Sequence, residues 1–99
     1  MNDQTVAEPE QLYRDLEIVN RRGLHARATA KFVQCCERFN AAVTVAKDGE
    51  TVGGASIMGI LTLGAGIGST IRVGASGPDA QAVLDALSEL VANKFDEGE

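Results

Sequence analysis

The spacing of apolar residues along this chain changes close to residue 25. Before that point Leu16 and Ile18 alternate with polar neighbours, which predicts a strand over about Leu12–Val19. After it the apolar residues recur at the period of a helix, which we expect to end near Asn40. The residues on this helical face are Phe32, Val33, Cys36 and Phe39. Gly23 gives the backbone the freedom to turn, so the strand and the helix are expected to meet at a short loop.

His25, the single histidine of the chain, falls at or just before the first turn of this helix. The start of a helix carries unpaired backbone N–H groups and a partial positive charge. Together with the Arg27 guanidinium two residues further on, the stretch predicts a site prepared for an anion. The alternative is that His25 is an ordinary surface residue or helix cap, and the spacing alone leaves both interpretations open.

Two short strands are expected after the first helix. Apolar and polar residues alternate over Ala42–Ala46, which predicts the second strand. The turn Lys47–Glu50 contains Asp48-Gly49, a strong hairpin signal, and Thr51–Gly53 then forms a short third strand.

A second helix and a fourth strand follow. Ser56 is a preferred N-cap for Ile57–Leu63, whose length suits two helical turns. Gly59 weakens this assignment, and a strand remains the alternative. The run Gly64–Gly68 ends the element, and Thr70–Val73 alternates as the fourth strand.

The last helix opens at Ser76–Asp79, where Pro78 suits the first helical position and Asp79 the positive helix end. Its apolar stripe consists of Ala80, Val83, Leu84, Leu87 and Val91. Phe95 is expected to pack against the end of this helix, and residues 96–99 to form a frayed acidic tail.

The predicted order β-α-β-β-α-β-α indicates an α+β fold. It favours a four-stranded, largely antiparallel sheet that is covered on one face by three helices. Residues 11–95 are expected to form this single domain, and residues 1–10 an acidic flexible extension. The uncovered face of the sheet should be wet, and its expected members are Arg14, Asp15, Thr44 and Arg72.

Composition excludes several classes of function. A net charge of -5 argues against nucleic-acid binding, because phosphate contacts need clustered Lys and Arg. Arg21, Arg22 and Arg27 are a local exception, which either attracts a negative partner or is a solvated loop. No stretch is long and apolar enough to span a bilayer and the N-terminus lacks a signal pattern, so we expect a cytoplasmic protein without membrane contact.

Cys35 and Cys36 are neighbours, a spacing that suits neither a metal site nor an easy disulfide. On a helix they point about 100° apart, so we expect Cys36 in the core and Cys35 nearer the edge. A hydrolase built from these cysteines and His25 would need a third orienting group, and most of a helix separates the residues. The run Gly64–Gly68 lacks the residues and the setting of a nucleotide-binding loop.

Two segments resemble the signatures of the HPr family, the histidine phosphocarriers of the phosphoenolpyruvate:sugar phosphotransferase system. They are Gly23-Leu24-His25-Ala26-Arg27 and Ala55-Ser56-Ile57-Met58-Gly59-Ile60-Leu61-Thr62-Leu63-Gly64. Their order and spacing also fit the family, and the resemblance covers about Leu12 to Phe95. It implies an open-faced β-sandwich and a monomeric carrier, rather than an enzyme, with no cofactor and no metal.

The resemblance implies that His25 accepts a phosphoryl group from phosphorylated enzyme I and passes it to a IIA-type domain, with Arg27 stabilising the phosphate. It also implies that Ser56 is the target of an HPr kinase/phosphorylase. The residues expected to dock partners are Leu24, Ala26, Ile57, Met58 and Leu61. Where the family usually has proline after the arginine, this chain has Ala28, which relies on helix propensity to form the first turn.

The runner-up to a sugar-transport carrier is a regulatory adaptor of the nitrogen type. Such a protein would share the fold and signal by binding partners according to its phosphorylation state. The two differ in their partners, so the residues of this chain leave both open.

Overall fold

The chain alternates strands and helices in the expected order, and the computed structural model describes residues 11–97. The strands are β1 (Leu12–Glu17), β2 (Ala42–Lys47), β3 (Glu50–Gly53) and β4 (Thr70–Ser76). The helices are α1 (Ala26–Glu37), α2 (Ile57–Thr62), α3 (Ala80–Ala92) and the short 3-10 helix η1 (Lys94–Asp96). The expected acidic extension over residues 1–10 lies outside the described residues.

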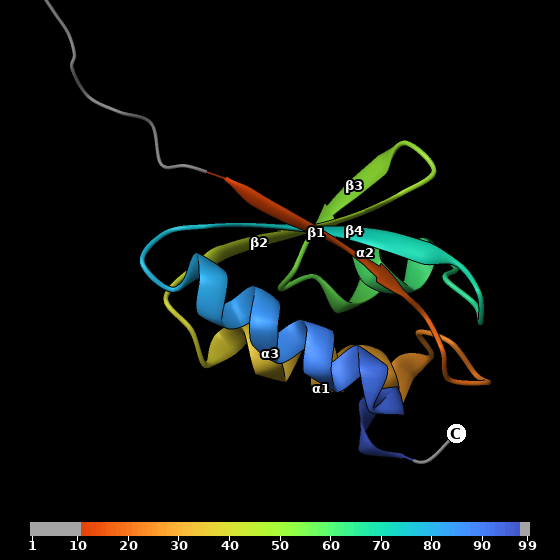
Figure 1. The fold of residues 1–99 in the computed structure, drawn as a ribbon. Coiled ribbons are helices and arrows are strands. Elements are labelled where there is room, and N and C mark those ends of the chain that lie inside the picture. The colour runs from red at the N-terminus through yellow and green to blue at the C-terminus, as the bar shows by residue number, and fades with distance from the viewer. Residues whose placement is uncertain (1–10, 98–99) are drawn as a thin grey trace, which may run out of the picture.

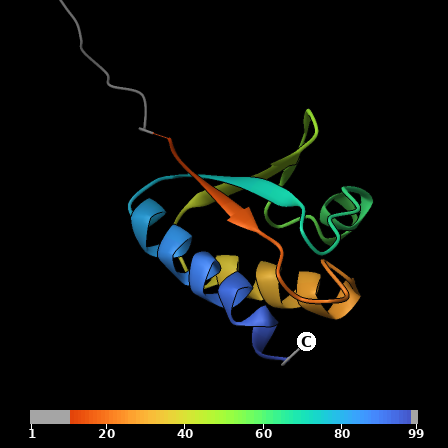
Figure 2. The same cartoon turned by 45° about the vertical axis from the view of Figure 1, so that its right-hand side comes forward.

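The four strands form one antiparallel sheet in the order β1-β4-β2-β3, so the last strand in sequence lies between the first and the second. The helices cover one face of this sheet, and α1 and α3 run side by side across it (Figures 1 and 2). This confirms the α+β, open-faced architecture. The β2–β3 hairpin closes through Asp48 and Gly49, which both have positive φ (52° and 86°), as the tight primed turn requires.

The core fills the layer between the sheet and the helices. Ile71 and Val73 of β4 and Val45 of β2 point into it and are fully buried. The predicted stripe of α3 is confirmed in full, since Ala80, Val83, Leu84, Leu87 and Val91 are all buried. Because β4 is an inner strand between β1 and β2, its buried side chains lie in the middle of the core that joins the helices to the sheet.

Two helix ends differ from the sequence-based expectation. Helix α1 ends at Glu37. The Arg38 and Phe39 N–H groups donate to the Cys35 and Cys36 carbonyls, so no left-handed residue at Asn40 is needed. Helix α3 begins at Ala80, two residues after Pro78. The reason is a reciprocal contact: the Asp79 carboxylate accepts from the Asn40 N–H at 2.8 Å, and the Asp79 N–H donates to the Asn40 carbonyl at 3.1 Å.

The uncovered face of the sheet carries Asp15 and Arg72 as predicted, but Arg14 lies on the opposite side. Side chains alternate along a strand, so Arg14 shares the covered face with Leu16. Its guanidinium reaches α3, where it donates to the carboxylate of Asp85 at 2.9 Å. On the open face the Arg72 guanidinium donates to the Asp15 carboxylate at 2.9 Å, which lowers the pKa of that carboxyl below its usual value.

The turn before α1 packs directly on the loop before β4. Gly23 has φ +66°, a conformation that residues with a side chain rarely adopt. A Cβ added there would lie 2.5 Å from the Ala65 carbonyl oxygen and 2.8 Å from the Gly66 Cα. The neighbouring Leu24 N–H donates to that same Ala65 carbonyl at 2.9 Å. Glycine at position 23 therefore permits a close backbone contact between two loops that are far apart in sequence.

We expect Gly23→Ala to destabilise the protein more than Gly64→Ala does. Gly64 has nearly the same φ (+64°), but nothing lies within 4 Å of an added Cβ. Gly64→Ala should lower the free energy of unfolding by about 1–2 kcal/mol, the cost of the left-handed conformation. Gly23→Ala should lower it by about 1–3 kcal/mol more, because the clash is with backbone atoms. Urea denaturation of both variants checks this, and equal losses would show that the loop contact is not tight.

Candidate functional site

His25 occupies the N-cap position of α1, which confirms its expected place at the helix start. The first hydrogen bond of the helix runs from the Thr29 N–H to the His25 carbonyl, at 2.8 Å. The N–H groups of residues 26–28 precede that bond and have no acceptor within the helix. The imidazole makes no capping hydrogen bond, and the side chain is 17% exposed, so it lies half-buried at the surface.

A buried asparagine orders the loop that leads to His25. Asn20 donates from its side-chain amide to the Gly23 carbonyl at 2.8 Å, and the Asn20 backbone carbonyl accepts from the Gly23 N–H at 3.1 Å. The Thr29 hydroxyl donates to the Leu24 carbonyl at 3.2 Å. The sequence analysis missed the roles of Asn20 and Thr29, although an asparagine shortly before a glycine is a common turn signal.

The carboxylate of Glu97 lies against the predicted anion site. Its Oε1 is 3.8 Å from the His25 Nε2 and 3.6 Å from an Arg27 guanidinium nitrogen, and its Oε2 is 3.2 Å from the Lys31 ammonium. The side chain is only 12% exposed. The prediction of a frayed tail is therefore wrong for Asp96 and Glu97, because η1 and these ion pairs hold them, whereas residues 98–99 lie outside the described residues.

The charges around Glu97 keep it ionised. Burial by itself raises the pKa of this carboxyl, but Lys31, Arg27 and His25 together outweigh burial and hold the pKa below its ordinary value. Lys31 also donates to the Phe95 carbonyl at 2.8 Å. Lysine and glutamate at these positions gave no sequence signal of their own, because they meet through the fold rather than along one helix.

The residues expected to dock partners divide into exposed and buried ones. Met58 is 71% exposed, and Ile57 and Ala26 are also at the surface, whereas Leu61 is half-buried. Leu24 contradicts the expectation: it is 6% exposed, because its backbone is bonded to Ala65 and its side chain packs into the core. The remaining docking assignments stay predictions.

A residue that the sequence analysis passed over adds to the apolar surface. Ile67 is 61% exposed and lies in the loop that packs on the Gly23 turn. Arg21 and Arg22 are exposed in the loop before His25, and the Arg27 side chain is 69% exposed. The surface around the histidine thus combines exposed apolar side chains with exposed positive charge.

Ser56 caps α2, which the structure shows to be a helix rather than the alternative strand. Its hydroxyl accepts from the Gly59 N–H at 3.0 Å and remains exposed. An added Cβ at Gly59 would lie 2.8 Å from that hydroxyl and 3.0 Å from Val52, which explains a glycine inside the helix.

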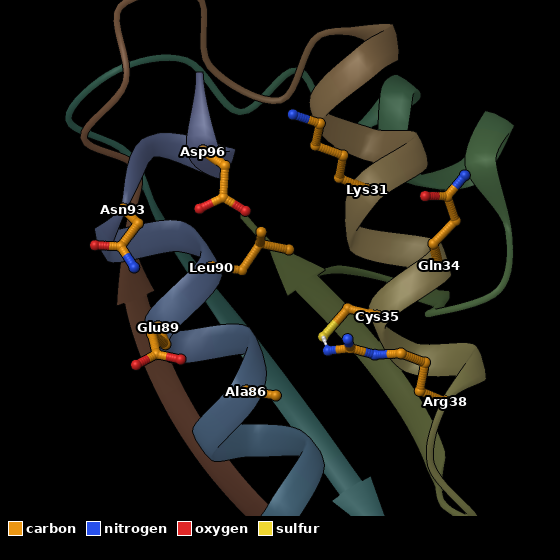
Figure 3. A pocket seen from close by; sticks show the side chains of 9 residues that line it. All are labelled: Lys31, Gln34, Cys35, Arg38, Ala86, Glu89, Leu90, Asn93 and Asp96. Atoms are coloured by element: carbon orange, nitrogen blue, oxygen red, sulfur yellow. Dashed lines mark hydrogen bonds between the residues drawn. The ribbon is translucent and has the colours of Figure 1, made fainter. Parts of the chain in front are cut away.

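A groove of about 360 Å³ lies on the outer side of α1 and α3, and His25 is not among the residues that line it. Figure 3 shows Arg38 reaching back to Cys35, whose sulfur accepts at 3.6 Å.

Both Cys35 and Cys36 are buried, so the expectation that Cys35 lies nearer the edge is wrong. The packing of α3 over α1 covers Cys35. Burial raises the pKa of the Cys36 thiol to about 12, which keeps it protonated at neutral pH.

We expect the thiols to react slowly with iodoacetamide at pH 8 in the folded protein. The thiolate is the reactive form, and the raised pKa of Cys36 reduces its population. The rate of alkylation, measured by mass spectrometry, should be at least about a hundredfold lower than in guanidinium-unfolded protein, where the thiol regains an ordinary pKa. Equal rates in both states would contradict the burial of these groups.

The arrangement at His25 suits an anion. A neutral imidazole is a competent nucleophile near pH 7, and first-turn N–H groups and a guanidinium bind phosphate oxygens. Within residues 11–97, no three His, Cys, Asp or Glu side chains gather in a way that would hold a metal ion. None of the helices in that range has the length and apolar character to span a bilayer.

Comparisons with known proteins place these features in a family. The family described as "PTS HPr component phosphorylation site" matches residues 12–93. The phosphocarrier protein HPr of Cupriavidus necator is 49% identical over 88 residues, which cover 89% of this chain and 99% of that protein. The phosphocarrier protein NPr of Shewanella violacea is 42% identical over 86 residues, covering 87% and 94%. The crystal structure of HPr-C-His from Thermoanaerobacter tengcongensis matches with a TM-score of 0.83 at 40% identity, covering 87% and 97%.

Proposed function

Because this chain belongs to the HPr family of phosphocarriers in the phosphoenolpyruvate:sugar phosphotransferase system, we propose that His25 accepts and passes on the phosphoryl group. Enzyme I and IIA proteins are the partners of this family in general. The observation that carries the proposal is the position of the imidazole at the start of α1, beside the Arg27 guanidinium.

The transfer is a displacement at phosphorus. A ring nitrogen of neutral His25 donates its lone pair to the phosphorus of phosphorylated enzyme I. The bond from phosphorus to the atom of enzyme I that carried it breaks as the new bond forms, and its electrons return to that atom. The N–H groups of residues 26–28 and the Arg27 guanidinium meet the charge on the phosphoryl oxygens. A second displacement of the same kind moves the group to a IIA protein.

Ala28 changes the donor set at the helix start. Proline has no backbone N–H, whereas Ala28 in the first turn of α1 has one. Helix α1 still begins at Ala26, and Ala28 is fully buried, so the first turn is anchored without the proline ring. This chain therefore has an additional amide available for a phosphate at His25.

We expect incubation with phosphoenolpyruvate and enzyme I to add one acid-labile phosphate to the wild-type protein. His25→Ala should add none, and it should fold normally because the histidine makes no capping hydrogen bond. Intact-mass spectrometry before and after acid treatment checks this. Phosphate on the His25→Ala variant would move the acceptor to another residue, and no phosphate on either protein with a competent enzyme I would reject the carrier function.

The alternative is a regulatory adaptor, since the similar proteins include one named NPr as well as several named HPr. Both branches accept phosphate, so the assay that separates them supplies the phosphorylated protein with a sugar-type and a nitrogen-type IIA acceptor. Faster loss of the phosphate to the sugar-type acceptor supports the carrier, and faster loss to the other supports the adaptor. Ile57, Met58 and Ile67 are the exposed apolar residues we propose for this recognition.

Ser56 is proposed as a regulatory phosphorylation site. Its hydroxyl is exposed at the start of α2, next to Ile57 and Met58. A phosphate there adds about -1.5 to -2 charge, which the helix start tolerates well. Inhibition would then come from charge within the docking surface rather than from unfolding.

We expect an HPr kinase/phosphorylase with ATP to phosphorylate the wild-type protein once and Ser56→Ala not at all. Ser56→Asp should slow the phosphorylation of His25 by enzyme I by about tenfold or more. The reason is that the new carboxylate in the docking surface repels the negatively charged phosphoryl group that enzyme I delivers. Thr51→Asp, which adds the same charge on β3, is the control and should have little effect. Absence of phosphate on Ser56 after exposure to the kinase would remove this proposal.

A further inference from the structure

The groove between α1 and α3 carries opposite charges at its two ends. Its volume of about 360 Å³ falls within the usual range of small-molecule pockets, roughly 300–1,000 Å³. Arg38 of α1 and Asp96 of η1 both line it, and Figure 3 shows the guanidinium and the carboxylate turned toward the space between the helices. His25 is not a lining residue, so the groove is separate from the site at the start of α1.

These two charges do not neutralise each other or any other side chain within residues 11–97. Neither Arg38 nor Asp96 takes part in an ion pair in that range, and the same holds for Glu89, a third charged residue that lines the groove. Opposite charges that face one space without meeting are complementary to a ligand that carries both charges itself.

Uncharged neighbours hold the Arg38 guanidinium in the groove. It donates to the Cys35 sulfur at 3.6 Å and lies over the Phe39 ring, 5.7 Å from its centroid. A guanidinium has five N–H donors in a fixed planar arrangement, and the sulfur accepts only one of these bonds. Arg38 is therefore oriented by contacts that leave its charge available, and a carboxylate can accept two parallel hydrogen bonds from such a group.

The surface between the two charges is apolar. Leu90 and Ala86 of α3 are half-buried and line the groove, and Figure 3 shows Leu90 between the Arg38 guanidinium and the Asp96 carboxylate. The amides of Gln34 and Asn93 complete the lining with groups that both donate and accept. A matching ligand thus has one anionic group, one cationic group and an apolar part that covers Leu90.

We propose that this groove binds an α-amino acid with an apolar side chain. The carboxylate of the ligand pairs with Arg38, its ammonium group pairs with Asp96, and its side chain packs on Leu90 and Ala86. A simple carboxylic acid would leave Asp96 without a partner, and a simple amine would leave Arg38 without one, so the zwitterion matches the groove better than either. The chain then has a ligand site in addition to His25.

The test is an NMR titration of the isotope-labelled full chain with L-leucine at about pH 6.5, where an α-amino group is charged. The backbone amide signals of Gln34, Arg38, Leu90 and Asn93 should shift saturably, and the signal of Val45 in β2 should stay in place. Leucinamide, which lacks the carboxylate, and 4-methylpentanoate, which lacks the ammonium group, should each have a Kd about fivefold or more above that of leucine.

Two variants remove one charge each from the groove. Arg38→Gln and Asp96→Asn should each raise the Kd for leucine about fivefold or more. Both replaced side chains are exposed, and asparagine tolerates the φ of 61° at position 96, so the variants should fold normally. The matched controls are Arg21→Gln and Asp48→Asn, which remove the same charges outside the groove. Asp48 is likewise exposed, with a φ of 52°, and both controls should keep the Kd of wild type.

Three results would each overturn the proposal. The first is the absence of saturable shifts in the groove at the solubility limit of leucine. The second is a Kd for Arg38→Gln and Asp96→Asn no higher than that of the two controls. The third is equally tight binding of leucinamide or 4-methylpentanoate. None of these measurements involves phosphate, so they stand or fall independently of the proposed role of His25.

Discussion

The contact between the Gly23 turn and the loop that begins at Gly64 is the constraint on which the rest of the site depends. A hydrogen bond from Leu24 to Ala65 closes it, and the missing side chain of Gly23 makes the approach sterically possible. This contact holds the start of α1 against the loop before β4. The loop that begins at Gly64 directly follows α2 in the chain. The contact therefore also fixes the position of His25 relative to α2, which carries the exposed Met58.

The electrostatics of the site suit a group that has to be gained and lost. Helix N-termini at exposed positions contribute about 0.3–1 kcal/mol to anion binding, a moderate amount. Arg27 is largely exposed, so water screens much of its attraction for a phosphate. Glu97 supplies an opposing charge that the sequence analysis assigned to a tail. Moderate attraction of this kind fits a carrier better than a tight binding site.

The sequence predicted those features that depend on neighbours along the chain. The element order, the β2–β3 hairpin, the Ser56 cap and the apolar stripe of α3 all follow from local periodicity and turn chemistry. The errors occurred where a distant element decides. Arg14 points toward Asp85 on α3, and α3 covers Cys35 on α1. Both positions depend on how α3 packs, which the residues next to Arg14 and Cys35 in sequence do not indicate.

The sequence by itself determined that His25 stands at a helix start with an arginine two residues later, because capping and helical period are local properties. It also determined the family through its two signatures. Only the tertiary structure decided that Leu24 is buried and that Glu97 reaches the imidazole. The physical reason is that α1 and η1 come together through the buried Phe95 and the Lys31 hydrogen bond, contacts between residues that no local pattern relates.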